Sequence, residues 1–258
     1  MEPDSGRKTT ALTLIERTDA RIRELENLPQ AESQLVSGSK TKTIFSINGL
    51  KFHFDGLEGQ KTGAFLDQRE NYAAASAYAR GHALDVFCYE GGFALHLARK
   101  CSTVVGVDSS RPALEAAEKS SRLNKKQFVS SEIEWIEANA FDLMKDYSAA
   151  SKLYDTIVLD PPAFAKNKRA SETALRGYKE LNLRAFKMLR PGGILVTCSC
   201  SFHVSESDFL EMLTEAAADA HKSVRILERR GQSPDHPTTL GIPETSYLKC
   251  VICQVNPG

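Results

Sequence analysis

From about residue 70 onward, short apolar runs alternate with amphipathic stretches. The apolar runs are rich in Val, Ile and Leu, which is typical of strands covered on both faces. This alternation predicts an α/β fold with a mostly parallel seven-stranded sheet and helices on both faces. The predicted strands are 83–88, 102–107, 132–137, 154–159, 192–198, 224–228 and 247–255, and the predicted helices are 70–80, 92–100, 111–123, 141–149, 171–189 and 205–220.

The segment before this pattern has a different organisation. Residues 9–28 carry apolar side chains at helical spacing up to Pro29, which predicts an N-terminal helix. Asn48-Gly49 separates two alternating runs and predicts a β-hairpin, because both turn positions favour positive φ. We therefore divide the chain into an N-terminal helix and linker (1–42), a β-hairpin region (43–60) and the α/β domain (61–258).

Composition limits the possible partners. The 258 residues are 41% hydrophobic, and basic and acidic side chains both number 33, so any nucleic-acid surface must be local. The chain has no apolar run of about 20 residues and no apolar leader at its start, which argues against a membrane span and a secretory signal. The six scattered cysteines favour a reducing cytoplasm. Cys250 and Cys253 would face opposite sides of a strand, so no metal site is predicted.

A glycine pair or a polar residue follows each of four successive predicted strands. Gly91-Gly92, Asp108, Asn139 and Asp160 come after the first, second, third and fourth strands, whose carboxyl ends share one edge of the sheet. An acid at the tip of the second strand suits a ribose diol, and the missing G-x-G-x-x-G pattern argues against a dinucleotide. A mononucleoside such as S-adenosylmethionine fits better. The alternative is that Asp108 and Asn139 only cap the following helices.

Two cysteines end the predicted strand 192–198. Cys198 and Cys200 are one residue apart, and Asp160 ends a neighbouring buried strand. A thiol and a carboxyl group at the same sheet edge suggest covalent chemistry on an electron-poor ring.

Several stretches together resemble one known family. They are Lys61-Thr-Gly63-Ala-Phe65-Leu-Asp67-Gln68-Arg69, Asp85-Val-Phe-Cys-Tyr-Glu-Gly-Gly-Phe93, Val107-Asp108-Ser109-Ser110, Asp160-Pro-Pro-Ala-Phe164, Arg176-Gly-Tyr178-Lys179 and Thr197-Cys-Ser-Cys200-Ser201. The chain resembles the bacterial ribosomal RNA large-subunit methyltransferases that make 5-methylcytosine. The resemblance implies a Rossmann-like class I methyltransferase domain that uses S-adenosylmethionine. Such enzymes usually begin with a small RNA-binding PUA domain, for which the residues before 9 are too few, so a fragment and a natural lack of that domain both stay open.

The resemblance also implies roles for single residues. The 88–92 turn would wrap the amino-acid end of the cofactor, Asp108 would hold the ribose hydroxyls, and Asn139 would lie by the adenine. The nucleophile falls on Cys200, because the family pattern is T-x-S-C-S, with Cys198 as second choice. The full expected cofactor set is Gln68, Arg69, Phe87, Tyr89, Gly91, Gly92, Asp108, Ser109, Asn139, Ala140 and Asp160.

The expected chemistry begins with addition of the Cys200 thiolate to carbon 6 of cytosine, which activates carbon 5. A protonated Asp160 would hydrogen-bond to ring nitrogen 3, so a raised pKa is expected for this carboxyl group. The later removal of the carbon 5 proton would use Cys198 or water.

Substrate contacts are expected after Asp160. The target base must leave its stack, and Phe164 or Tyr178 would stack on it unless both are core residues. Residues 165–190 contain eight basic and two acidic side chains, so this block, including Lys166, Lys168 and Lys179, would grip phosphates unless it is only a solvated helix face. The acidic segment 205–219 should face away from RNA.

Other functions remain open from the sequence. A guanine ring-nitrogen methyltransferase would share the K-T-G and D-P-P signatures without the cysteine at the strand end. An exocyclic-amine methyltransferase and a non-catalytic RNA-binding module are further alternatives. The expected partner is ribosomal RNA, without membrane or metal, and the oligomeric state is left open, with a homodimer as one option.

Overall fold

The computed structural model describes residues 12–57, 64–128, 131–164, 169 and 171–256. The chain divides into two compact units. Unit 1 comprises Met1–Phe45 and His53–Gly63, and unit 2 comprises Ser46–Phe52 and Ala64–Gly258.

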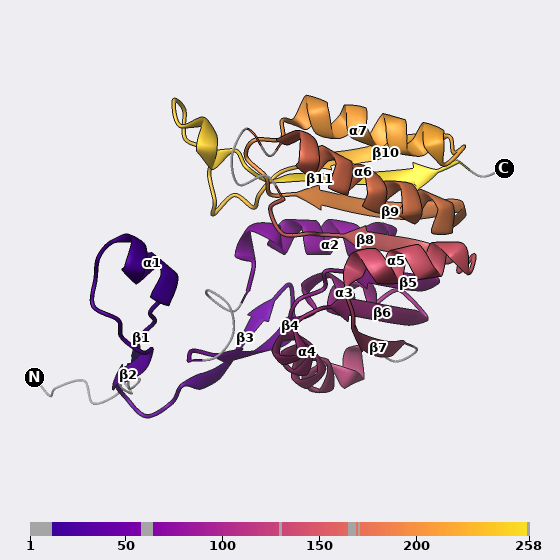
Figure 1. The fold of residues 1–258 in the computed structure, drawn as a ribbon. Coiled ribbons are helices and arrows are strands. Elements are labelled where there is room, and N and C mark those ends of the chain that lie inside the picture. Colours follow the sequence, from indigo (N-terminus) through magenta and orange to yellow (C-terminus); the bar gives the residue numbers. More distant parts are fainter. Residues whose placement is uncertain (1–11, 58–63, 129–130, 165–168, 170, 257–258) are drawn as a thin grey trace, which may run out of the picture. The chain divides into compact units, whose positions relative to one another are not determined.

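Unit 2 contains the predicted seven-stranded sheet (Figure 1). The strand order is β10-β11-β9-β8-β5-β6-β7, and all neighbours are parallel except β11, which runs antiparallel to both β9 and β10. The mostly parallel sheet is thereby confirmed. The strands are β5 (His82–Val86), β6 (Thr103–Asp108), β7 (Glu132–Glu137), β8 (Tyr154–Leu159), β9 (Leu189–Ser199), β10 (Val224–Arg230) and β11 (Lys249–Val255).

Helices cover both faces of this sheet, as expected. On β5, Leu84 and Val86 belong to the buried cluster that includes side chains of α5, α6 and α7. Asp85, between them, points the other way and accepts a hydrogen bond from the amide of Ala94 in α3. The helices are α2 (Arg69–Tyr78), α3 (Gly92–Leu97), α4 (Arg111–Leu123), α5 (Ala140–Ala149), α6 (Ser171–Met188) and α7 (Glu206–Asp219), with short 3₁₀ turns η1 (Leu66–Gln68), η2 (Lys125–Gln127) and η4 (Pro243–Thr245).

The chain order creates a topological switch point at one edge of the sheet. After β5 the chain builds β6 and β7 on one side and then returns to place β8 on the other side of β5. The loops that follow β5 and β8 therefore leave the sheet in opposite directions. Ligands of doubly wound sheets bind at such a switch point, outside the carboxyl ends of the strands.

The predicted hairpin is confirmed. β3 (Lys42–Ile47) and β4 (Leu50–Asp55) pair with each other, and Asn48 and Gly49 have φ values of 49° and 79°. Within unit 2 the hairpin turn is anchored, because the side-chain amide of Asn48 donates to the carbonyl of Arg69 at 2.8 Å.

The predicted helix over 9–28 is wrong for most of its length. Within unit 1, Leu14–Glu16 forms strand β1, which pairs antiparallel with β2 (Gln34–Ser37) inside the predicted linker, and only α1 (Ala20–Leu25) is helical. Asp19 explains the late start, because its side chain accepts a hydrogen bond from the amide of Ile22 and so caps the first turn. Residues 9–11 lie outside the described residues.

Candidate active site

Asp160 lies at the end of β8 and is held by Gln68. The side-chain amide of Gln68 donates to Oδ1 of Asp160 at 2.9 Å and accepts from Asn71 at 2.7 Å. Loss of hydration, together with the nearby charge of Asp67, raises the pKa of Asp160 to about 7. The carboxyl group can therefore carry a proton near neutral pH, as expected from the sequence.

The two cysteines have different environments. Cys200, just beyond β9, is partly exposed, whereas Cys198 is fully buried opposite Cys250 of β11. Burial and the charge of Asp160 raise the pKa of Cys200 to about 11, and burial raises the pKa of Cys198 well above its usual value. Of the two thiols, Cys200 is the one that a substrate can reach.

Lys249 was not expected in this site. It begins β11, is 8% exposed, and donates to the carbonyls of Ser201 at 2.7 Å and Tyr247 at 2.8 Å. Burial lowers its pKa to about 8. A lysine at the end of a strand is usually solvated. The sequence signal for a buried Lys249 was therefore weak and consisted of the apolar run that follows it.

The loop after β10 is tied to the segment that carries Gln68. The hydroxyl of Tyr247 donates to Oδ2 of Asp67 at 2.7 Å, and the amide of Ser233 donates to the carbonyl of Asp67 at 2.8 Å. Arg69 forms ion pairs with Glu70 at 3.1 Å and Asp235 at 2.9 Å. The guanidinium of Arg69 is thus engaged by protein carboxylates, and its expected contact with the cofactor stays a prediction.

Asp108 closes the turn that follows β5. Its Oδ2 accepts from the amide of Tyr89 at 2.9 Å, and its Oδ1 accepts from the amide of Ser110 at 2.8 Å. Each carboxylate oxygen has a further lone pair for a ribose hydroxyl. Ser109 beside it is exposed.

Asn139 caps a helix, as the alternative interpretation stated. Its Oδ1 accepts from the amides of Phe141 at 2.9 Å and Asp142 at 3.3 Å at the start of α5, where Ala140 is buried. The side-chain NH₂ of Asn139 is not used by this cap, and its expected contact with adenine stays a prediction.

The glycines of the 88–92 turn lie against two aromatic rings of the protein. Gly91 has a φ of 82° and turns the chain sharply, as expected. However, a Cβ at Gly91 would lie 2.8 Å from the ring of Trp135, and one at Gly92 would lie 2.6 Å from the ring of Tyr72. The missing side chains therefore make room for protein rings, and the expected contact of this turn with the cofactor stays a prediction.

The described residues fit an S-adenosylmethionine ligand at this turn. Asp85, which the sequence analysis missed, is fully buried, and its Oδ1 has no hydrogen-bond partner among the described residues. Burial raises its pKa well above the usual value. A buried acid beneath the turn and Asp108 at the strand tip offer acceptors for the polar groups of a nucleoside. The signal for Asp85 was a lone acid inside an apolar strand.

The expected substrate residues have mixed outcomes. Tyr178 is fully buried, its hydroxyl lies 3.0 Å from that of Ser201, and its ring centroid is 4.7 Å from that of Phe164. This burial favours the core interpretation of Tyr178, because the ring has no free face for a base. Phe164 also packs near Phe87, at 6.5 Å between centroids, but keeps partial exposure.

The structure does not support phosphate binding by Lys179. Its ammonium pairs with Glu215 at 2.9 Å and Asp219 at 3.0 Å, both on α7, the acidic helix expected to face away from RNA. Lys166 and Lys168 lie outside the described residues.

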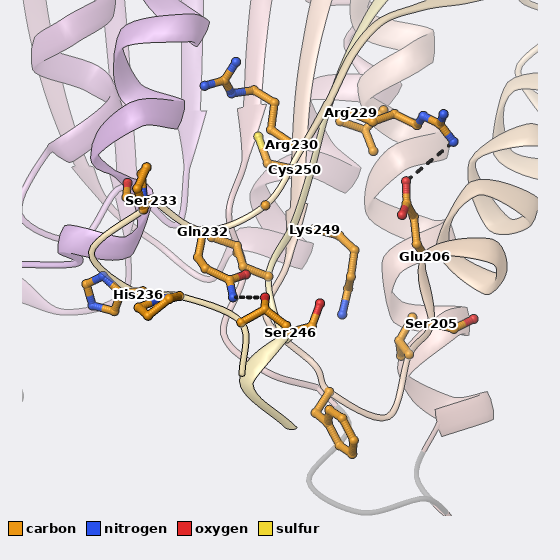
Figure 2. A pocket seen from close by; sticks show the side chains of 18 residues that line it. Ser205, Glu206, Arg229, Arg230, Gln232, Ser233, His236, Ser246, Lys249 and Cys250 are labelled. Carbon is orange, nitrogen blue, oxygen red and sulfur yellow. Dashed lines mark hydrogen bonds and ion pairs between the residues drawn. The ribbon is translucent and has the colours of Figure 1, made fainter. Parts of the chain in front are cut away.

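A cavity of about 550 Å³ adjoins the cysteine end of the site (Figure 2). Its walls are the segments 202–206, 229–238 and 246–251, which include Lys249. Figure 2 shows the Lys249 side chain reaching between Ser246 and Ser205, while Arg229 pairs with Glu206 at 3.7 Å. No pattern in the sequence indicated this cavity, because its walls come from three segments that lie far apart in the chain.

The comparisons with known proteins agree with this fold. Residues 18–251 match the model of a family described as S-adenosylmethionine-dependent methyltransferase. The chain therefore belongs to the S-adenosylmethionine-dependent methyltransferase family, and its cofactor is S-adenosylmethionine.

Similar curated proteins carry a more specific name. Ribosomal RNA large subunit methyltransferase I of Photobacterium profundum is 39% identical over 247 residues, which cover 94% of this chain and 62% of the relative. The protein of the same name from Pseudoalteromonas atlantica is 39% identical over 94% of this chain and 61% of the relative. The chain thus spans less than two thirds of the length of these relatives.

Solved structures support the fold. A methyltransferase complexed with SAH superposes with a TM-score of 0.73 at 20% identity, covering 86% of this chain and 59% of that chain. A methyltransferase from Streptococcus mutans gives a TM-score of 0.73 at 19% identity, with 86% of this chain and 58% of that chain covered.

Within the described part of the chain, none of the helices has the length and apolar character needed to cross a bilayer.

Proposed function

We propose that this protein is a cytoplasmic RNA methyltransferase that forms 5-methylcytosine in large-subunit ribosomal RNA through a covalent adduct with Cys200. The observation that carries the proposal is the pairing of a reachable thiol with a protonatable carboxyl group. Cys200 is partly exposed at the end of β9, and the charge of Asp160, at the end of neighbouring β8, acts on its pKa. The relatives named for ribosomal RNA methylation support the substrate class.

The thiolate of Cys200 donates an electron pair to carbon 6 of cytosine and forms a carbon–sulfur bond. The electrons of the 5,6 double bond move toward nitrogen 3, where the protonated Asp160 supplies a hydrogen bond or a proton. Carbon 5 thereby becomes nucleophilic. S-adenosylmethionine, when bound, supplies an electrophilic methyl group on a sulfonium.

Release restores the aromatic ring. A base takes the proton from carbon 5, the double bond re-forms, and the carbon–sulfur bond breaks to return the electron pair to Cys200 as a thiolate. Water is the proton acceptor that this geometry favours. Cys198 is fully buried, and its raised pKa keeps it a neutral thiol, so it is poorly suited to take the proton from carbon 5 of the cytosine.

The adduct can be trapped. RNA that contains 5-fluorocytosine offers no removable proton at carbon 5, so the enzyme incubated with this RNA and S-adenosylmethionine should form a species that survives denaturing electrophoresis. We expect Cys200→Ala to abolish it and the matched Cys198→Ala to retain it. The same pattern should hold for methyl incorporation into unmodified RNA.

Two results would contradict the proposal. An adduct that persists in Cys200→Ala and disappears in Cys198→Ala would transfer the nucleophile to Cys198. Methylation by folded Cys200→Ala at the unaltered rate, with no adduct trapped in any variant, would exclude covalent catalysis and favour methylation of a ring nitrogen or an exocyclic amine. Calorimetric titration with S-adenosylmethionine shows whether each variant still binds the cofactor.

A further inference from the structure

We propose that Lys249 is a positioning residue that holds the backbone presenting Cys200 and stabilises the Cys200 thiolate with a buried positive charge. The inference rests on the proposed function, because it assigns a role to Lys249 only if Cys200 attacks the substrate. It concerns a residue that lies 49 positions after Cys200 in the chain and on another strand.

Lys249 contacts the chain both before and after Cys200. Lys249 is the register partner of Ser199, the residue before Cys200, in the antiparallel pairing of β11 with β9. Its ammonium donates at 2.7 Å to the carbonyl of Ser201, the residue after Cys200. Lys249 therefore fixes the chain before the thiol through strand pairing and the chain after it through its side chain, at the point where β9 ends.

The ammonium of Lys249 has no carboxylate within ion-pair distance among the described residues. Its ammonium donates to the neutral carbonyls of Ser201 and Tyr247 and forms no ion pair among the described residues. Glu206, the acid on the same cavity wall, is paired with Arg229 at 3.7 Å. Burial of a cation without a countercharge is unfavourable, so its presence beside a thiol points to an anion that forms there during the reaction.

The groups around Cys200 leave Lys249 as its stabilising charge. Asp160 and Asp67 oppose ionisation of the thiol, and the hydroxyls of Tyr178 and Tyr247 also lie within electrostatic range of it. Lys249 acts in the opposite direction and lowers the pKa of Cys200, while Cys200 in turn raises that of Lys249. Glu206 is the other acid that acts on Lys249.

The same charge serves both ends of the reaction. It favours the thiolate that attacks carbon 6, and it favours the thiolate that leaves when the carbon–sulfur bond breaks. A lysine that only supported the fold would affect neither the ionisation of the thiol nor the pH at which the thiol reacts.

Alkylation of Cys200 by iodoacetamide tests the inference, because only the thiolate reacts. The rate constant is measured from pH 6 to pH 10 in the full chain, and the modified cysteine is located by peptide mass spectrometry. We expect Lys249→Met to slow alkylation of Cys200 by about tenfold at pH 7, where Lys249, with a pKa of about 8, is mostly protonated, since a change of one pKa unit in the thiol alters the thiolate fraction about tenfold. Lys145→Met, at an exposed position of α5, is the matched control and should leave the rate unchanged.

Two further variants separate charge from hydrogen bonding. Lys249→Arg keeps the charge and should react within a few fold of the wild type, whereas Lys249→Gln keeps only a donor and should be as slow as Lys249→Met. Equal rates in Lys249→Gln and wild type would overturn the electrostatic role, as would an unchanged rate in a folded Lys249→Met. Thermal melting checks that each variant is folded. If Lys249→Met does not fold, the comparison of Lys249→Arg with Lys249→Gln remains decisive.

The assay is independent of the substrate. It uses neither RNA nor S-adenosylmethionine. A raised thiol pKa in Lys249→Gln, together with no adduct between the wild-type protein and 5-fluorocytosine RNA, would refute the proposed function and leave the interaction of Lys249 with Cys200 standing. An adduct that forms normally in both Lys249→Gln and Lys249→Met would refute the role of Lys249 and leave the proposed function standing.

Discussion

The opposed ionisation requirements of Asp160 and Cys200 predict an unusual pH profile. The reaction needs Asp160 protonated, with a pKa of about 7, and Cys200 ionised, with a pKa of about 11. Below about pH 7 Asp160 stays protonated, and the thiolate fraction rises about tenfold per pH unit. Above about pH 7 the gain in thiolate is offset by the loss of the Asp160 proton. The pH dependence of kcat/KM should therefore rise and then level off near pH 7, with about one molecule in 10⁴ in the productive state.

Asp160→Asn removes one of the two requirements. The amide oxygen can still accept from Gln68, and its NH₂ can donate to ring nitrogen 3 at every pH. The variant should be slower in absolute terms, because an amide cannot transfer a proton. Its kcat/KM should nevertheless keep rising about tenfold per pH unit above pH 7, so its activity relative to the wild type should increase about 100-fold between pH 7 and pH 9. Loss of the carboxylate should also lower the pKa of Cys200.

Radiolabelled methyl transfer to RNA, measured at low RNA concentration from pH 5.5 to 9.5, gives kcat/KM for both proteins. Circular dichroism at each pH confirms that they stay folded. The reasoning is refuted if the wild type rises through pH 8 without levelling, or if Asp160→Asn levels off at the same pH as the wild type.

Two further predictions concern cofactor binding and stability. Asp108→Ala should weaken S-adenosylmethionine binding about 10- to 100-fold in calorimetry, because hydrogen bonds to a charged group contribute about 1.5–3 kcal/mol; unchanged affinity would remove Asp108 from the cofactor site. His96 is fully buried, donates its Nδ1 proton to the carbonyl of Gly92, and has a pKa lowered to about 4 by burial. Its folded pKa lies below the unfolded value, so the stability that it contributes is present above about pH 6.5 and is lost, by up to about 3 kcal/mol, as pH falls toward 4. Urea titrations of His96→Gln should show a shallower loss over that range, and an equally steep loss would assign acid sensitivity to other groups.

The sheet could be predicted because its central strands β5, β8 and β9 are mostly apolar and buried, and because its helices begin and end with local signals. α7, for example, starts at a capping box in which Ser205 and Asp208 bond to each other's backbone. The N-terminal segment could not be predicted in the same way. Its apolar spacing fits a helix, but Asp19 starts the helix late, and β1 pairs with residues about 20 positions away.

The strand-end residues of the site could be predicted because parallel strands bring their carboxyl ends to one edge. Asp160 at the end of β8, hydrogen-bonded to Gln68, and Cys198 near the end of β9 lie at the carboxyl ends of neighbouring parallel strands. Lys249 could not be found this way, because it enters from the antiparallel strand β11, whose amino end meets the carboxyl end of β9. Tertiary contacts of this kind leave no periodic pattern in the sequence.

The turn after β5 contains two aromatic residues in the left-handed backbone region, Phe87 with φ of 67° and Tyr89 with φ of 48°. Residues other than glycine occupy this region at a cost of about 1–2 kcal/mol each. Directed evolution toward heat resistance alone would favour glycine at both positions, and the rings would be lost with the strain. Libraries screened for melting temperature should therefore keep these two codons constant, or the screen should measure methyl transfer as well as melting temperature.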